Sequence, residues 1–252
     1  MRSLALVLAL VALSASASDA AYEAATTVKD GGTLSGVVRF AGAAPALAPL
    51  PISRGQDACG GDRQASEAFQ IGPDRGVKGG VVRIEGVTMG KKPAGDVLLD
   101  TQQCRFVSHV SALAVGERAR VKNSDGLVHN VLGSVDGATV FNVALPHRDQ
   151  QVDITRRLRQ PGIVRVLCEA HPHMFAWLVV HDSPYVAVTD ERGAFRISDV
   201  PPGTYSVTLW HEGFRPRGPD RDGRPHYDVA RTLTKQVTIA PRGAATIEFE
   251  LK

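Results

Sequence analysis

The chain has 252 residues, 43% of them hydrophobic, and a formal net charge of +3. A chain of this length can form one large or two small domains, each with a buried core. Its basic residues are scattered and have few aromatic neighbours, which argues against nucleic-acid binding, and the nearly balanced charge favours neither an acidic nor a basic partner.

The first twenty residues, MRSLALVLALVALSASASDA, have the pattern of a secretory signal peptide: Arg2, an apolar run over 4–13 and then small residues. About ten apolar residues are too few to cross a bilayer, which needs roughly 20. We expect a signal peptide over 1–17, with cleavage after Ala17; cleavage after 18–20 is the alternative. No later segment is apolar enough to span a membrane. The sequence therefore predicts an exported protein, which we interpret as periplasmic.

The apolar residues after the leader come in short runs that alternate or contain β-branched side chains, and Gly, Pro and Asp separate these runs. Such runs occur at 35–40, 79–87, 119–123, 162–168 and 246–251. No long run has the 3.6-residue period of an amphipathic helix, and the 25 Gly and 15 Pro residues shorten any helix. The sequence predicts an all-β protein.

Two changes of texture divide the chain. Residues 43–78 have no regular pattern and predict a long connection or strap. After position 183 the sequence YVAVTDERGAFRISDVPPGTYSVTLW alternates evenly between turns, as in a small antiparallel sandwich. We expect a first domain over 27–182 and a second over 183–252, with a long exposed loop at 212–228.

Three cysteines in an exported protein predict one disulfide and one remaining thiol. Cys59 and Cys104 are the better pair because neither lies near His or Met at the spacing of metal ligands. Closing a loop of that size stabilises a fold by about 3 to 4 kcal/mol. Cys168 is then the odd thiol, and a metal ion would occupy it.

The segment LCEAHPHMF combines Cys168, His171 and Met174 in the spacing C-x2-H-x2-M. A thiolate, an imidazole and a weak thioether are ligands of a blue-copper electron-transfer site, which needs one more His. His129 follows the turn NSDG and has β-branched neighbours, so it is expected at the end of a strand. A histidine there and a cysteine at the end of a later strand converge at one end of a sandwich.

The pattern N-S-D-x3-H-N-V followed by V-x-C-x2-H-P-x-M resembles the cupredoxins, and the loop CEAHPHM has the ligand spacing of the amicyanin loop. The resemblance covers roughly 95–182. It implies a Greek-key β-sandwich with one type 1 copper ion, in which Asn130 braces the ligand loop and the solvent-near edge of His171 is the electron port. The copper ligands that it implies are His129, Cys168, His171 and Met174.

Other histidines leave alternatives open. His173 forms an H-x-H pair with His171 and competes for the metal in principle, although strand alternation and loop turning favour His171. His147, beside a proline, lies where it could approach the site. The histidines without ligand neighbours in sequence, which we expect to be structural or on the surface, are His109, His181, His211 and His226.

The motif T-D-x-x-G-x-F followed by P-P-G-x-Y resembles the carboxypeptidase regulatory-like, transthyretin-like sandwich. That resemblance implies a structural or interaction module and no catalysis. The N-terminal segment GGTLSGVVRFAGAAP resembles the opening strand of the same module. The sequence leaves open whether this strand completes the second module or the copper domain.

The resulting hypothesis is a periplasmic, monomeric type 1 copper protein that carries single electrons between redox partner proteins and is not itself an enzyme. Binuclear copper and oxidase clusters need a second nearby Cys or several H-x-H pairs, and a tetrahedral zinc site is disfavoured by the Met at short spacing. Two alternatives remain: a Cu(I) storage or delivery protein that uses Cys168, His171, Met174 and His173, and a structural envelope protein.

Overall fold

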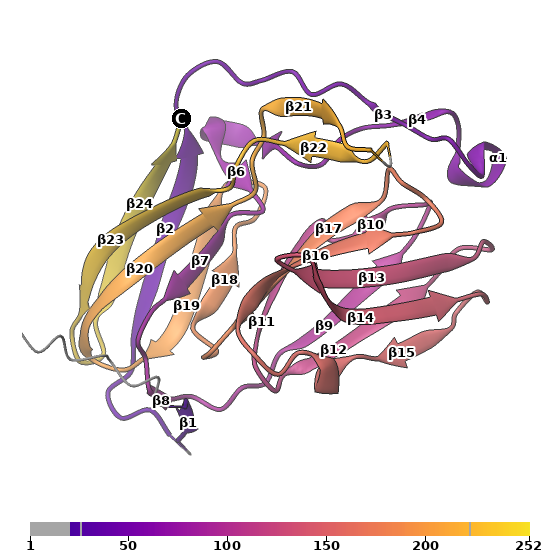
Figure 1. Cartoon of the computed structure of the whole chain (residues 1–252). Coiled ribbons are helices and arrows are strands. Elements are labelled where there is room, and N and C mark those ends of the chain that lie inside the picture. Colours follow the sequence, from indigo (N-terminus) through magenta and orange to yellow (C-terminus); the bar gives the residue numbers. More distant parts are fainter. Residues whose placement is uncertain (1–20, 26, 222) are drawn as a thin grey trace, which may run out of the picture.

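The computed structural model describes residues 21–25, 27–221 and 223–252; the predicted signal peptide over 1–17 lies outside the described residues. Two β-sandwiches stand side by side (Figure 1) and confirm the expected all-β class. Among the described residues, no helix has both the length and the apolar character to cross a membrane.

The first sandwich, here called the inserted sandwich, has one sheet with the strand order β10-β9-β12-β15 and a second with the order β11-β17-β16-β13-β14. Its elements are β9 (Asp96–Thr101), β10 (Phe106–Val107), β11 (Val110–Ala114), β12 (Arg118–Asn123), β13 (His129–Val135), β14 (Ala138–Leu145), β15 (Gln151–Asp153), η2 (Thr155–Arg157), β16 (Gly162–Cys168) and β17 (Phe175–His181). The pairs β9–β12 and β11–β17 are parallel, as in a sandwich with crossover connections.

The second sandwich, the host sandwich, has sheets of order β18-β7-β20-β23 and β19-β2-β24. Its strands are β2 (Gly32–Phe40), β7 (Val81–Ile84), β18 (Val186–Val188), β19 (Ala194–Val200), β20 (Gly203–His211), β23 (Arg231–Ile239) and β24 (Ala244–Leu251). One of its pairings, β2 with β24, is parallel.

The host sandwich corrects the division of the chain expected from the sequence. The range 27–182 includes β2 and β7, yet β2 pairs with β19 and β24, and β7 pairs with β18 and β20. The physical reason is burial: alternate residues of β2, such as Leu34 and Val38, are fully buried in the host core. The N-terminal strand therefore belongs to the second module, and the sequence of the inserted sandwich lies between β7 and β18.

Strand β17 joins the two sandwiches. Its residues alternate between two apolar environments, so that Leu178 packs into the core of the inserted sandwich while Val179 and Trp177 face the host. Trp177 packs edge-on against Trp210 of β20, with ring centroids 5.4 Å apart. Burial on both faces explains the continuous hydrophobic run of this strand.

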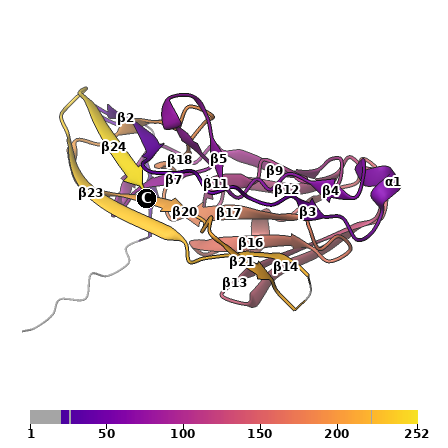
Figure 2. The ribbon, with the colours of Figure 1, turned by 90° about the horizontal axis from the view of Figure 1, so that it is seen from above.

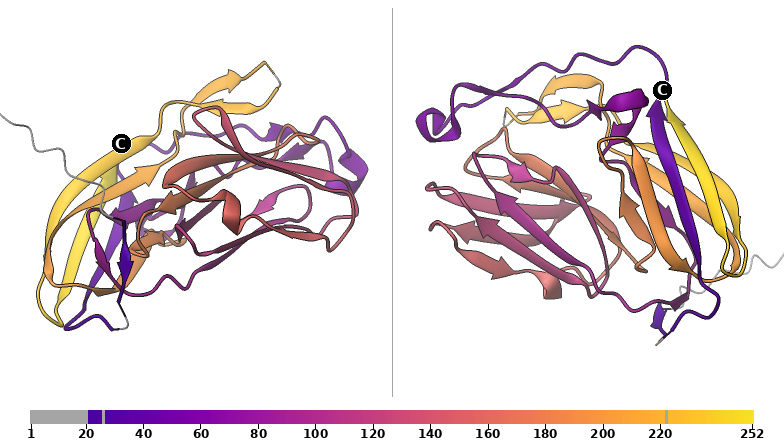
Figure 3. Two further views of the ribbon diagram at one scale, coloured as in Figure 1. Left: turned by 60° about the horizontal axis from the view of Figure 1, so that its bottom comes forward. Right: turned by 180° about the vertical axis from the view of Figure 1, so that it is seen from behind.

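A strap over residues 41–78 leaves β2, runs over both sandwiches to α1 at the far end, and returns to the host (Figures 1 and 3). Its elements are β3 (Leu50–Pro51), α1 (Gln56–Cys59), β4 (Arg63–Gln64), β5 (Gln70–Ile71), η1 (Pro73–Arg75) and β6 (Val77–Lys78). Two short strands at the base, β1 (Glu23–Ala24) and β8 (Met89–Gly90), pair with each other.

The segment 212–228, expected as an exposed loop, contains a hairpin of β21 (Pro216–Pro219) and β22 (Pro225–Tyr227). This hairpin lies beside the strap, as Figure 2 shows from above. The Tyr227 hydroxyl and the Ser66 Oγ are 2.5 Å apart, and Pro49 of the strap lines the same groove as Pro225. This hairpin is thus a part of the host sandwich that lies beside the strap and extends over the inserted sandwich.

Candidate metal centre

The predicted ligands come together at one end of the inserted sandwich because two of them occupy strand ends. His129 is the first residue of β13 and Cys168 the last residue of β16, and these antiparallel strands place Val131 opposite Cys168. The loop after Cys168 carries His171 and returns through Met174 to β17. All four side chains are buried, with at most 5% of any of them exposed.

The thiol of Cys168 lies between the two imidazoles. Its Sγ is 3.6 Å from His129 Nδ1 and 3.6 Å from His171 Nδ1, and all three ligand atoms lie within 4.8 Å of one another. One ion with bonds of about 2.0 Å to nitrogen and about 2.3 Å to sulfur, at angles of roughly 110 to 120°, holds such atoms about 3.5 to 3.7 Å apart. The spacing of these residues therefore fits a single shared metal ion.

Met174 closes the ligand loop. Its backbone N–H donates to the His171 carbonyl at 3.0 Å, and the backbone N–H of Cys168 donates to the Met174 carbonyl at 3.2 Å. The Met174 side chain is 1% exposed and belongs to the same apolar cluster as Cys168. These contacts hold the Met174 backbone beside Cys168. A thioether, a thiolate and two imidazoles together are the donor set of soft copper sites.

Asp125 sets the tautomer of His129. Its Oδ2 lies 2.9 Å from His129 Nε2, so the Nε2–H donates to the carboxylate and the Nδ1 lone pair faces Cys168. The same carboxylate accepts the backbone N–H groups of Gln103 and Cys104 at 2.6 and 2.9 Å. The sequence indicated only a turn at Asp125. Its position four residues before His129 is the feature that could have predicted a contact between the two side chains.

Two asparagines hold the backbone around these ligands. The buried Asn123 donates through Nδ2 to the carbonyls of Leu127 and Leu145 at 2.7 and 2.9 Å, and this fixes the turn that leads to His129. Asn130 donates to the side chain of Glu169, and its carbonyl accepts the Glu169 N–H at 2.9 Å. Asn130 therefore contacts the residue that follows Cys168, while its predicted bracing role stays a prediction.

The site favours neutral imidazoles. Burial, together with the positive charge that His129 and His173 would carry, lowers the pKa of His171 to about 4. Burial also lowers the pKa of His129, although the Asp125 carboxylate opposes this shift. Both rings therefore keep a free nitrogen lone pair at neutral pH, which a metal ion requires.

The thiol has opposing influences. Burial raises the pKa of Cys168, whereas hydrogen bonds from the backbone N–H groups of Asn130, His171 and Ala170 favour the thiolate. Arg224 of the hairpin, 9% exposed, adds a positive charge and donates from Nη1 to the Cys168 carbonyl at 3.0 Å. A metal cation would complete the stabilisation of the thiolate.

The remaining candidates lie outside the ligand group. His173 is buried, but its Nε2 donates to the Cys104 carbonyl at 3.1 Å, and no partner is found for its Nδ1 in the described structure. His147 is exposed on the connection after β14, where its backbone N–H donates to the Gln150 side chain. Neither belongs to the groups of possible metal ligands among the described residues.

The structure does not expose the predicted electron port. His171 is only 5% exposed, and the strap covers its outer edge. A Cβ at Gly55, where φ is +70°, would lie 3.3 Å from His171 Nε2 and 3.4 Å from Cys59 Sγ. The predicted disulfide between Cys59 and Cys104 is confirmed, with a Cα–Cα distance of 5.2 Å, and it holds the tip of the strap over the site.

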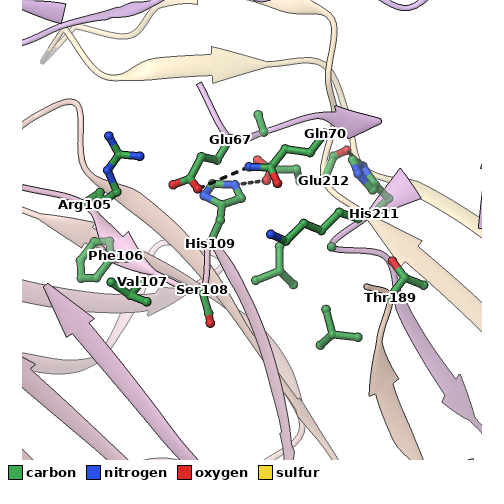
Figure 4. Close-up of a pocket in the computed structure, with 15 residues that line it drawn as sticks. Glu67, Gln70, Arg105, Phe106, Val107, Ser108, His109, Thr189, His211 and Glu212 are labelled. Atoms are coloured by element: carbon green, nitrogen blue, oxygen red, sulfur yellow. Dashed lines mark hydrogen bonds and ion pairs between the residues drawn. The ribbon is translucent and has the colours of Figure 1, made fainter. Parts of the chain in front are cut away.

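A separate cavity of about 480 Å³ lies where the strap and the two sandwiches meet (Figure 4). His109 forms a buried ion pair there with Glu212. Burial alone would lower the pKa of His109, but the Glu212 carboxylate raises it above its usual value. His109, expected to be structural or exposed, is thus buried with its ring paired to Glu212, and the raised pKa favours its protonated form.

The comparison with protein families agrees with the resemblance found for the second module. Residues 176–252 match the family model of the carboxypeptidase regulatory-like domain. The comparison with curated proteins found no match.

Solved structures similar to the chain include a reduced Cu(I) mutant of amicyanin at pH 4. The two sequences are 16% identical, the match covers 40% of this chain and 98% of that chain, and the TM-score is 0.29. Amicyanin from Paracoccus versutus has 16% identity, 40% and 97% coverage and a TM-score of 0.28. An oxidised mutant of amicyanin has 15% identity, 46% and 94% coverage and a TM-score of 0.28. At these values the likeness says nothing about function.

Proposed function

We propose that this chain is a mononuclear type 1 copper protein that carries single electrons between redox partner proteins. The observation that carries the proposal is the position of Cys168 Sγ, 3.6 Å from both His129 Nδ1 and His171 Nδ1 in a fully buried site. The bound copper supplies one-electron chemistry by alternating between Cu(I) and Cu(II).

The residues of the chain keep this site rigid and dry. Asp125 holds His129 in the tautomer that turns Nδ1 inward, and the backbone N–H groups around Cys168 orient its sulfur. Because the ligands are fixed by strand ends and hydrogen bonds, they rearrange little when the charge of the metal changes. Because their side chains are at most 5% exposed, the ligands leave a substrate little access to the site, which favours electron transfer over catalysis.

Export to the periplasm is part of the proposal. The leader over 1–17 has the composition of a signal peptide, and the Cys59–Cys104 disulfide is typical of proteins outside the cytoplasm. The alternative of Cu(I) storage through His173 has less support, because His173 belongs to neither group of possible metal ligands among the described residues.

The test is the visible spectrum of the mature protein loaded with Cu(II). We expect an intense thiolate-to-copper band that disappears in Cys168→Ser and persists in the matched control His147→Gln, which changes an exposed histidine. Copper bound without this band in the wild type would refute the proposal.

A further inference from the structure

The disulfide lies against the side of His171 that faces away from Cys168. His171 Nδ1 is directed at Cys168 Sγ, whereas Nε2 and Cys59 Sγ are both next to the Cβ position of Gly55. The sulfurs of Cys59 and Cys104 and a ring nitrogen of His171 all lie within 4.8 Å of one another. Two potential thiolates and a neutral imidazole thus surround one point above the proposed copper site.

The buried ligands also raise the question of how copper reaches them. His129 and Cys168 are 0% exposed, and the strap covers the outer edge of His171. The tip of the strap is a short helix, α1, that the disulfide joins to the Cys104 turn. Opening this tip is the most direct way to uncover the ligands.

The two ends of the disulfide are held differently. The Cys104 backbone is fixed on both sides, since its N–H donates to Asp125 and its carbonyl accepts from His173. Cys59 lies on α1, which the rest of the strap holds through hydrogen bonds such as that of the Gln56 side chain to the Ile52 carbonyl. Reduction therefore leaves Cys104 in place beside the site and frees Cys59 to move with the strap.

We propose that, in the reduced chain, Cys59, Cys104 and His171 form a second site that binds Cu(I) and loads the copper centre beneath it. Thiolates and imidazole are soft to intermediate donors that suit Cu(I). Metal–sulfur bonds of about 2.3 Å hold two thiolates of one ion roughly 4 Å apart. A small displacement of Cys59 after cleavage of the S–S bond provides this separation.

The chemistry balances with a dithiol as the reductant. The dithiol gives two electrons and two protons by thiol–disulfide exchange, the Cys59–Cys104 bond breaks, and the dithiol becomes a disulfide. Cu(I) then replaces the two thiol protons, which pass to water, and its oxidation state does not change. Because His171 offers Nε2 to this site and Nδ1 to the inner one, one ring borders both positions.

The inference rests on the proposed function for the identity of the metal and for the inner site that receives it, and Cys168→Ser tests the outer site alone. This variant lacks the inner thiolate but keeps all three outer donors. We expect the variant, reduced with a phosphine, to withdraw one equivalent of Cu(I) from a coloured Cu(I) chelator, and X-ray absorption to show two sulfur ligands. The disulfide form of the same variant is expected to withdraw at least tenfold less.

Two further variants separate ligation from opening of the strap. In the Cys168→Ser background, His171→Ala should weaken Cu(I) binding by at least tenfold, while the control His147→Gln should not. With Cys168 intact, Cys59→Ala/Cys104→Ala opens the strap without supplying thiolates, so it should load copper more slowly than reduced wild type. Thermal melting confirms that each variant is folded.

Several results would overturn the inference. One is a reduced Cys168→Ser variant that competes no better than its disulfide form, and another is a preference of that site for Zn(II) over Cu(I). Equal loading rates in Cys59→Ala/Cys104→Ala and in reduced wild type would show that the thiolates take no part. A wild type without the charge-transfer band would instead count against the proposed function.

Discussion

The inserted sandwich buries histidines in two regions and shifts their pKa values in opposite directions. At the metal end, burial keeps His171 and His129 neutral, even though Asp125 contacts His129. At the junction with the host, Glu212 raises the pKa of His109 and favours the cation. Asp125 also accepts two backbone N–H groups, which share its charge. A buried histidine beside a carboxylate can therefore have a lowered or a raised pKa, depending on the other groups that the carboxylate binds.

The largest expected effect separates ligation from stability. His129→Asn should abolish the charge-transfer band completely, because one of the two imidazoles that flank Cys168 is lost. The melting temperature of the metal-free protein should change much less. A band of full intensity in this variant would remove His129 from the ligand set.

At the junction with the host we expect the reverse, a loss of stability without a change in the copper spectrum. Glu212→Gln leaves His109 buried without its partner and should lower the free energy of unfolding by about 3 to 5 kcal/mol, while the copper spectrum is retained. Chemical denaturation measures the loss, with the exposed Glu191→Gln as the matched control. An unchanged stability would show that this pair is not an ion pair in solution.

A smaller effect is expected at Asp125, which contacts the buried His129 as Glu212 contacts the buried His109. Asp125→Asn keeps the size of the side chain but removes the charge that orients His129, and such partners typically contribute 10- to 100-fold to metal affinity. Competition with a chelator measures this change. Asp136→Asn, in an exposed turn, is the control, and equal affinities in the two variants would contradict the role of Asp125.

A substitution of Arg224 tests whether the host module affects the reduction potential of the proposed copper site. Arg224→Gln removes a positive charge hydrogen-bonded to the Cys168 carbonyl and should lower the reduction potential on the order of 50 mV, for an effective dielectric constant near 20. Voltammetry measures the shift, and Arg217→Gln on the exposed strand β21 is the control. A rise in potential would contradict the electrostatic effect.

The pH dependence of stability should differ between the regions. His171 stays neutral in the folded chain down to about pH 4, whereas the unfolded chain takes up the proton near pH 6.5, so the metal-free protein should lose stability as the pH falls between these values. The His109–Glu212 pair acts in the opposite sense, with its contribution present below the unfolded pKa and lost as the pH rises through the folded pKa.

Melting curves from pH 4 to 9 test both signs. His171→Asn should flatten the acidic side of the wild-type profile, because its proton uptake on unfolding is removed. The difference in melting temperature between wild type and Glu212→Gln should become smaller at the alkaline end of the range. If this difference in melting temperature instead increases with pH, the pKa of His109 is lowered rather than raised.

Local patterns in the sequence predicted the strands, the two module resemblances and the disulfide. The proposed ligands could be found because three of them lie within the segment LCEAHPHMF. The sequence leaves open the pairing of β2 with the host, although this segment resembles the opening strand of that module, because an alternating strand shows that one face is buried but not against what. Long-range contacts such as His109 with Glu212, or Arg224 with Cys168, have no local pattern at all.

The insertion also determines how the molecule responds to mechanical load. Strands β2 and β24 are parallel neighbours, with Thr33 opposite Ala244 and Phe40 opposite Leu251. A force that pulls the two ends of the described chain apart therefore shears this pair. Because β7 and β18 are paired, the inserted sandwich leaves and rejoins the host at adjacent strands, away from the line of force. The end of the inserted sandwich that carries the candidate ligands can thus remain undistorted while the described chain is held under tension at its ends.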